Sequence, residues 1–219
     1  MSPRLPLILL LGAWAGLAQA KPLVLLDAGH GGSDPGVKAD GFVEAEFTQD
    51  LAKRVEAALR SRGLDVRSTH SAGEGLSLSA RVELANNLQP LALVSLHANA
   101  AFQPLAAGPR IFVPGEGKVD EPAAPLWEQA ARLRAKDSRA LGTAIAKALG
   151  LGGPKPVQSL KMGLFRGLMV PVCVVETEFA TRPDGLAKLK DPGARQALAD
   201  RLAAGIAAYA GMGGGNAAP

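Results

Sequence analysis

Three residues are the clearest candidates for a chemical role in this sequence: His30, Glu44 and His97. His30 lies four residues after the apolar run 23–26, and His97 directly follows the apolar run 91–96. Glu44 comes fourteen residues after His30 and opens a helical pattern. Any one of them alone has a common structural role; for Glu44 it is an acidic first-turn residue that complements the helix dipole. Together, two imidazoles and a carboxylate form the ligand set of a zinc site that keeps a fourth position open.

Glu176 is the fourth candidate for a chemical role. It follows the apolar run 172–175, so a carboxylate arrives at the end of a buried strand. An unpaired buried carboxylate is costly, which argues against a purely structural use. A general base that takes a proton from water beside a metal fits such a place. The pattern therefore predicts Glu176 as the catalytic residue.

The elements that would position these side chains alternate between strands and helices. Apolar runs predict strands at 23–26, 64–67, 91–96, 110–113 and 170–175. Periodicity predicts helices at 45–62, 79–88, 138–149 and 194–209, the second one capped by Ser79. This order predicts a single-domain α/β sandwich of three layers, with a mainly parallel sheet and helices on both faces. The carboxyl ends of parallel strands share one edge, where we expect His30 and His97.

Composition narrows the function classes. The chain has 219 residues, 47% of them hydrophobic, with a net charge of +4 and 4% aromatics. It is neither disordered nor basic enough to neutralise a run of phosphates, so nucleic acid is not an expected partner. The single cysteine, Cys173, excludes an intrachain disulfide and a cysteine-based zinc site. We expect Cys173 to be a small core residue.

The two ends of the chain differ from its middle. Residues 1–20 carry one positive charge, a short apolar run and an Ala-Gln-Ala ending, which predicts a secretory signal peptide. An uncleaved anchor or a buried N-terminal helix is the alternative. Residues 21–210 are the predicted catalytic domain, and 211–219 form a glycine-rich tail expected to be disordered. No later segment could cross a bilayer, so we expect an exported protein, in the periplasm or the cell wall, without stable membrane insertion.

Four ordered motifs resemble the zinc-dependent N-acetylmuramoyl-L-alanine amidases of the type 3 family. They are Asp27-Ala28-Gly29-His30-Gly31-Gly32, Glu44, Ser95-Leu96-His97-Ala98-Asn99 and Val175-Glu176-Thr177-Glu178-Phe179. Leu78-Ser79-Ala80-Arg81 also matches, and the likeness runs from about Leu23 to Tyr209. The resemblance implies a sheet of about six strands, one zinc ion held by His30, Glu44 and His97, and Glu176 as the catalytic group.

The resemblance also implies the reaction, which is cleavage of the amide between N-acetylmuramic acid and L-alanine in peptidoglycan. Two alternatives stay open. One is a catalytically silent peptidoglycan-binding or activator protein of the same fold, and the other is a zinc peptidase that cuts within the stem peptide.

Four further residues have open roles. Glu178 adds a charge that the family usually lacks; it either tunes Glu176 or turns away to pair with Arg182 or Lys188. For His70 we expect a surface position, and for Arg81 a salt bridge on a helix surface. Asp27 either orients a metal ligand or caps its turn.

The segment 114–137 reads as an insertion between a strand and a helix. In some relatives a longer helix here blocks the zinc until an activator protein displaces it. Glu116, Glu121 and Glu128 could serve in such a lid. A plain surface excursion is the preferred interpretation, because most long loops have no such role.

Overall fold

A single six-stranded sheet organises the part of the chain that the structure describes. The computed structural model describes residues 21–101, 107–115, 126–153 and 155–211. The sheet strands are β1 (Leu23–Ala28), β4 (Asp65–Ser68), β5 (Ala92–Asn99), β6 (Arg110–Val113), β7 (Val157–Ser159) and β8 (Val172–Phe179). A separate two-stranded hairpin consists of β2 (Lys38–Ala39) and β3 (Phe42–Val43).

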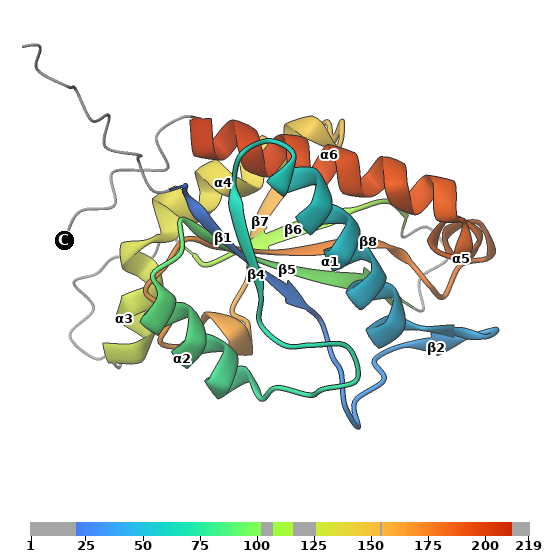
Figure 1. The fold of residues 1–219 in the computed structure, drawn as a ribbon, viewed down its shortest axis with the longest axis horizontal. Coiled ribbons are helices and arrows are strands. Elements are labelled where there is room, and N and C mark those ends of the chain that lie inside the picture. The colour runs from blue at the N-terminus through green and yellow to red at the C-terminus, as the bar shows by residue number, and fades with distance from the viewer. Residues whose placement is uncertain (1–20, 102–106, 116–125, 154, 212–219) are drawn as a thin grey trace, which may run out of the picture.

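Helices cover both faces of this sheet (Figure 1). They are α1 (Glu44–Arg60), α2 (Leu78–Leu88), α3 (Leu126–Leu133), α4 (Ala135–Ala148), α5 (Pro183–Lys190) and α6 (Pro192–Gly211), with a 3-10 turn η1 (Gly163–Phe165). The predicted α/β class with a mainly parallel sheet is confirmed.

The strand order is β4-β1-β5-β8-β6-β7. Strands β4, β1, β5 and β8 are parallel, whereas β6 is antiparallel to β8, and β7 is parallel to β6. The carboxyl ends of β1, β5 and β8 therefore meet at one edge, while the chain leaves β6 and β7 at the opposite edge.

Side chains of the central strands alternate between two apolar layers, as the period of two in a strand requires. Leu26, Val94 and Val175 belong to the larger layer, which α1, α4 and α6 cover. Leu25 and Val174 belong to the smaller layer, which also contains residues of α2, α3 and η1. Cys173 packs in the larger layer and is fully buried, as expected.

Helix α1 illustrates why the sequence pattern specifies an element. Phe47, Leu51, Val55 and Leu59 recur every four residues, and all four are buried against the sheet. That spacing places them on one stripe of an α-helix. The helix begins at Glu44, one residue earlier than predicted, so this carboxylate stands in the first turn.

Several elements differ from the prediction. Ser77 caps α2 in place of Ser79: its backbone is extended, and its Oγ accepts the Ala80 N–H at 3.2 Å. Ser79 lies inside the first turn, where it cannot cap. Strand β7, the β2–β3 hairpin and α5 were not predicted, because their runs of two to eight residues are too short for a periodic signal.

Some predictions fall on residues outside the described ranges. These are the signal peptide at 1–20, the tail at 212–219, and Glu116 and Glu121 of the proposed lid. The tail boundary was one residue early, since Gly211 still belongs to α6. The described part of the segment 114–137 forms α3 and the first residues of α4. Within the described ranges, no helix has the length and apolar character needed to cross a bilayer.

Candidate active site

The ends of β1 and β5 bring the two predicted histidine ligands together. The parallel register pairs Ala28 with Leu96, so His30 and His97 emerge at the same edge of the sheet. Their rings meet edge to face, with centroids 5.0 Å apart and an interplanar angle of 81°. The predicted proximity of the two histidines is confirmed.

Glu44 lies between the two imidazoles. Its Oε2 is 3.2 Å from Nε2 of His30, and its Oε1 is 3.1 Å from Nδ1 of His97. One potential ligand atom from each of the three residues lies within 4.8 Å of the other two. We refer to His30, Glu44 and His97 as the ligand group.

The ligand group fits a small tetrahedral cation. Bonds of about 2.0–2.1 Å in a tetrahedron place neighbouring ligand atoms roughly 3.3 Å apart. One Glu44 oxygen lies 3.2 Å from Nε2 of His30 and the other lies 3.1 Å from Nδ1 of His97, and both distances are close to that edge length. Nitrogen and carboxylate oxygen are also the donors that zinc accepts alongside thiolate.

Two glycines make room for this arrangement. A Cβ on Gly29 would overlap the imidazole of His97. A Cβ on Gly36 would lie 2.6 Å from Oε2 of Glu44 and 2.7 Å from Cδ2 of His30. Neither glycine was predicted as a site residue. The Gly-rich stretch after β1 was the available signal, and its meaning appears only once His97 is placed over it.

Hydrogen bonds to residues outside the ligand group fix the orientation of two of the three ligands, His30 and Glu44. Asp34 accepts from Nδ1 of His30 at 2.8 Å, which directs Nε2 toward Glu44. The Glu44 carboxylate accepts the backbone N–H of Val37 at 2.9 Å and of Ala98 at 3.0 Å. Partners of this kind set the tautomer and orientation of metal ligands. Asp34 was missed because an exposed acid in a turn gives no distinctive pattern.

His30 and Glu44 of the ligand group shift each other's pKa values. The neighbouring Glu44 carboxylate raises the pKa of His30 to about 9. Burial alone would raise the pKa of Glu44, but hydrogen bonds from both histidines and two backbone N–H groups hold it well below its usual range. A bound cation would take the place of the proton on His30 in balancing this buried carboxylate.

Glu176 stands beside the ligand group on β8. The parallel register pairs it with His97, and residues in register on neighbouring strands point to the same face. Burial raises the pKa of Glu176, while the nearby His97 opposes that shift. Within the described chain, no residue donates a hydrogen bond to its carboxylate, which leaves it available to a small molecule.

The Glu178 carboxylate contacts Gly108 and Lys188. One carboxylate oxygen, Oε1, accepts the Gly108 N–H at 2.9 Å, and Oε2 lies 3.2 Å from Nζ of Lys188. The side chain is 11% exposed, against 63% for Lys188. These contacts favour the pairing interpretation for Glu178, with Lys188 as the partner.

Behind the ligand group lies a buried ion pair that the sequence did not indicate. Arg81 Nη1 donates to Oδ1 of Asp27 at 2.6 Å, and both side chains are almost fully buried. Asp27 also accepts from Thr69 and Ser95, each at 2.7 Å. The expectation of a surface salt bridge for Arg81 is wrong, because α2 lies against the sheet and directs this side chain beneath the His30 loop.

Arg81 also holds the backbone that carries His30. Its guanidinium donates to the carbonyl oxygens of Ala28 at 2.9 Å and His30 at 2.7 Å. His30 has a φ of 63°, a left-handed conformation that costs free energy for a residue with a Cβ. The bidentate contact offsets that cost. Asp27 therefore anchors Arg81, and neither caps its turn nor orients a ligand directly.

His70 is buried, contrary to the expected surface position. Its Nδ1 lies 2.9 Å from Oγ1 of Thr69, and burial lowers its pKa. The Nε2 atom lies beneath Gly31, with no hydrogen-bond partner in the described structure. Glu74 and Gly75 of the loop that follows His70 lie against Gly31 and Gly32.

An open cavity of about 580 Å³ reaches two members of the ligand group, His30 and His97. His30 and His97 line one part of it, and Val174, Met162 and Gly163 line another. We call this cavity the active-site groove. Together with Glu176, it could admit an amide beside a bound metal.

Comparison with known proteins identifies the family of this chain. The family model described as N-acetylmuramoyl-L-alanine amidase matches residues 24–208. The N-acetylmuramoyl-L-alanine amidase AmiA of Salmonella typhimurium is 29% identical over 226 residues, covering 87% of this chain and 76% of that protein. The endolysin of Bacillus phage SPP1 is 29% identical over 188 residues, covering 84% of this chain and 65% of that protein.

Solved structures share the fold. The CwlD amidase from Clostridioides difficile, solved in complex with the GerS lipoprotein, has a TM-score of 0.74 at 20% identity, covering 88% of this chain and all of that one. The catalytic domain of CwlV from Paenibacillus polymyxa has a TM-score of 0.69 at 24% identity, covering 87% and 98%. With the family model spanning nearly the whole described chain, this protein is a member of the N-acetylmuramoyl-L-alanine amidase family.

Proposed function

We propose that this chain is an exported zinc enzyme that cleaves the amide between N-acetylmuramic acid and L-alanine in peptidoglycan. The observation that carries the proposal is the convergence of His30, Glu44 and His97 at one sheet edge, with Glu176 in register beside them. The family and the relatives named above support the reaction. Export rests on the signal-peptide pattern of residues 1–20.

Each residue has a distinct task in this proposal. His30, Glu44 and His97 would hold one zinc ion, which polarises the amide carbonyl and lowers the pKa of a bound water when present. Glu176 accepts a proton from the water that attacks the carbonyl carbon and delivers it to the departing alanine nitrogen. Arg81 and Asp34 keep His30 in place during this cycle.

The compartment and partners follow from the substrate. Peptidoglycan lies outside the cytoplasmic membrane, so the mature chain would act in a periplasm or cell wall. An activator protein stays a prediction; the GerS lipoprotein in the CwlD structure shows one partner bound to a protein of the same fold.

The decisive experiment is mass spectrometry of fragments released from purified peptidoglycan by residues 21–219 with zinc. We expect intact peptides that begin with L-alanine, together with glycan strands that carry free lactyl groups. Fragments cut within the peptide would indicate the peptidase alternative, and absence of any release would indicate the silent binding protein. His97→Ala, treated in the same way, controls for a contaminating hydrolase.

A further inference from the structure

Strand β8 contains one extra residue directly after Glu176. Glu176 pairs with His97 of β5, and the next pair in register joins Phe179 with Asn99. Two steps along β5 therefore correspond to three steps along β8, which defines a β-bulge. Bulges are rare between parallel strands, and bulges next to active sites re-aim a side chain. This one lies immediately beyond the residue to which we assign proton transfer.

Glu176 is the last residue of β8 that has in-register partners on both sides. Its partner on β5 is His97, and its partner on β6 is Arg110, the first residue of that strand. Val174, two positions earlier on β8, lines the active-site groove. Because side chains alternate with a period of two, Glu176 shares the face of Val174. Regular pairing thus orients Glu176 from one side, and the bulge adjoins it on the other.

A single hydroxyl connects the bulge to the strand that carries a metal ligand. Thr177 Oγ1 donates to the backbone carbonyl oxygen of His97 at 2.9 Å. Thr177 is only 2% exposed, so water competes little for this bond. Beyond the bulge the ladder resumes, since the Ala180 N–H donates to the carbonyl oxygen of Asn99 at 2.9 Å. The hydroxyl therefore joins the residue after Glu176 to the backbone of the ligand group.

The second bulge residue, Glu178, is held by other elements. Its carboxylate contacts Gly108, which precedes β6, and Lys188 of α5. A Cβ on Gly185 of α5 would lie 3.1 Å from Cγ of Glu178, so this helix packs closely against the bulge. Among the described residues, none of the side-chain bonds of Glu178 reaches β5. The connection from the bulge side chains to β5 is the Thr177 hydroxyl.

We propose that Thr177 is a positioning residue for Glu176: its hydroxyl holds the bulge against the His97 backbone and so fixes the Glu176 carboxylate relative to the ligand group. The inference rests on the proposed function, which gives Glu176 the proton transfer. Threonine suits this role because its branched Cβ restricts the side chain to few rotamers while the hydroxyl donates. Valine has nearly the same shape but has no donor.

Near-isosteric substitution tests the proposal. Thr177→Val removes the hydroxyl, and Thr177→Ser retains it. The matched control is Ser138→Ala in α4, which removes a buried hydroxyl at the other end of β8, where Ser138 Oγ accepts the Val172 N–H at 3.0 Å. Kinetics are measured on zinc-loaded residues 21–219 with a soluble N-acetylmuramoyl tetrapeptide. Zinc dissociation constants, and amide hydrogen exchange of the segment 176–181 in chelator-treated protein, are measured for the same variants.

We expect Thr177→Val to lower kcat by about 10-fold to 100-fold, because a misplacement of roughly 1 Å costs up to about 100-fold. KM and the zinc Kd should stay within about twofold. Thr177→Ser should retain kcat within about threefold, and Ser138→Ala should leave it unchanged. Exchange of the segment 176–181 should be faster in Thr177→Val alone. Added to Glu176→Gln, Thr177→Val should cause no further loss, because the hydroxyl acts through that carboxylate.

Three outcomes would overturn the proposal. The first is a wild-type kcat in Thr177→Val, or in Thr177→Ala if the valine variant does not fold by circular dichroism. The second is an equal loss in Thr177→Ser, which would assign the effect to the methyl group. The third is an additive loss in the Glu176→Gln background, or weaker zinc binding, which would make the hydroxyl a support of His97 alone. Failure of the proposed function is distinguishable, because the wild-type protein would then cleave no amide while hydrogen exchange would still report on the bulge.

Discussion

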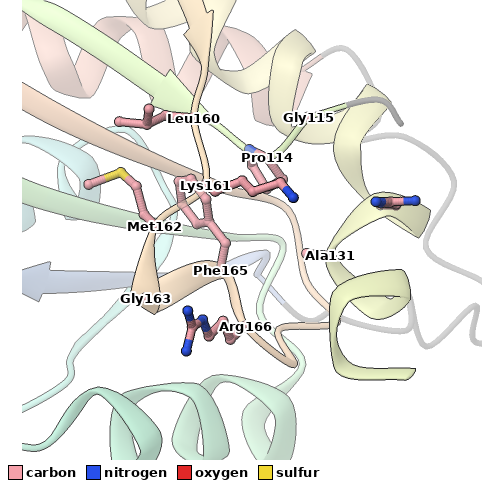
Figure 2. Close-up of a pocket in the computed structure, with 10 residues that line it drawn as sticks. Pro114, Gly115, Ala131, Leu160, Lys161, Met162, Gly163, Phe165 and Arg166 are labelled. Carbon is pink, nitrogen blue, oxygen red and sulfur yellow. The ribbon is translucent and has the colours of Figure 1, made fainter. Parts of the chain in front are cut away.

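The active-site groove adjoins a second cavity, of about 320 Å³, which is lined by Lys161, Phe165 and Arg166 and is called the basic cavity here (Figure 2). The two cavities are built in different ways. The groove carries its reactive residues at or just past the ends of β1 and β5 and within β8, where hydrogen bonds orient His30 and Glu44. In the basic cavity, the cations Lys161 and Arg166 are exposed and lie in the connection after β7. The contrast is between reactive side chains that buried hydrogen bonds hold in place, as catalysis requires, and exposed side chains carried by a connecting segment.

Removing one residue of the ligand group should have the largest effect on activity and should distinguish the groove most clearly from the basic cavity. His97→Ala is expected to abolish both zinc retention and amide cleavage, because two remaining ligands do not hold zinc in a stable site. Zinc content by atomic absorption after dialysis, with wall hydrolysis in parallel, measures this. Lys161→Gln in the basic cavity should retain one zinc ion per chain. A His97→Ala protein that retains zinc and cleaves the wall would contradict the assignment of the ligand group.

Glu176→Gln should separate catalysis from metal binding within the groove. We expect turnover to fall by about 10²–10⁴-fold with zinc retained, since the amide keeps the shape of the side chain but cannot accept the proton. Steady-state kinetics and zinc content are measured on the same sample. Loss of zinc in this variant would instead make Glu176 a ligand.

Arg81→Met tests whether the groove depends on its buried support. Removing one partner of a buried ion pair should lower the free energy of unfolding by about 3–5 kcal/mol, because it leaves Asp27 unpaired in the interior. Urea unfolding measures this. Arg54→Met, which breaks a partly exposed pair with Asp50, should cost less than about 1 kcal/mol. Equal losses of unfolding free energy in the two variants would show that burial does not make the Arg81 ion pair more important for stability than the Arg54 pair.

Glu178→Gln should have the smallest effect. Its partner Lys188 is largely exposed, so we expect a loss of less than about 1 kcal/mol in unfolding free energy. The acid limb of the pH–rate profile should not move, because the carboxylate faces Lys188 and Gly108. A downward shift of that limb would revive the idea that Glu178 tunes Glu176.

The sequence allowed prediction of the groove far better than of the basic cavity. His30, His97 and Glu176 follow apolar runs long enough to predict strands, and parallel strands bring their ends together. The α/β class followed from the same pattern. The position of Glu44 followed from the start of a periodic helix.

The remaining features depend on contacts between distant segments. Arg81 and Asp27 are 54 positions apart in sequence and meet only because α2 packs under the His30 loop. Gly29 matters because of His97, which lies on another strand. The basic cavity combines α3, the end of β6 and the connection after β7, and no local pattern links those segments.

The buried thiol of Cys173 has a consequence for how the protein withstands oxidants. It is fully buried in β8, and burial raises its pKa, so the reactive thiolate is scarce in the folded chain. Oxidants and disulfide exchange can therefore reach it only before folding or after unfolding. In an oxidising compartment, the yield of intact protein would then depend on how quickly the chain folds.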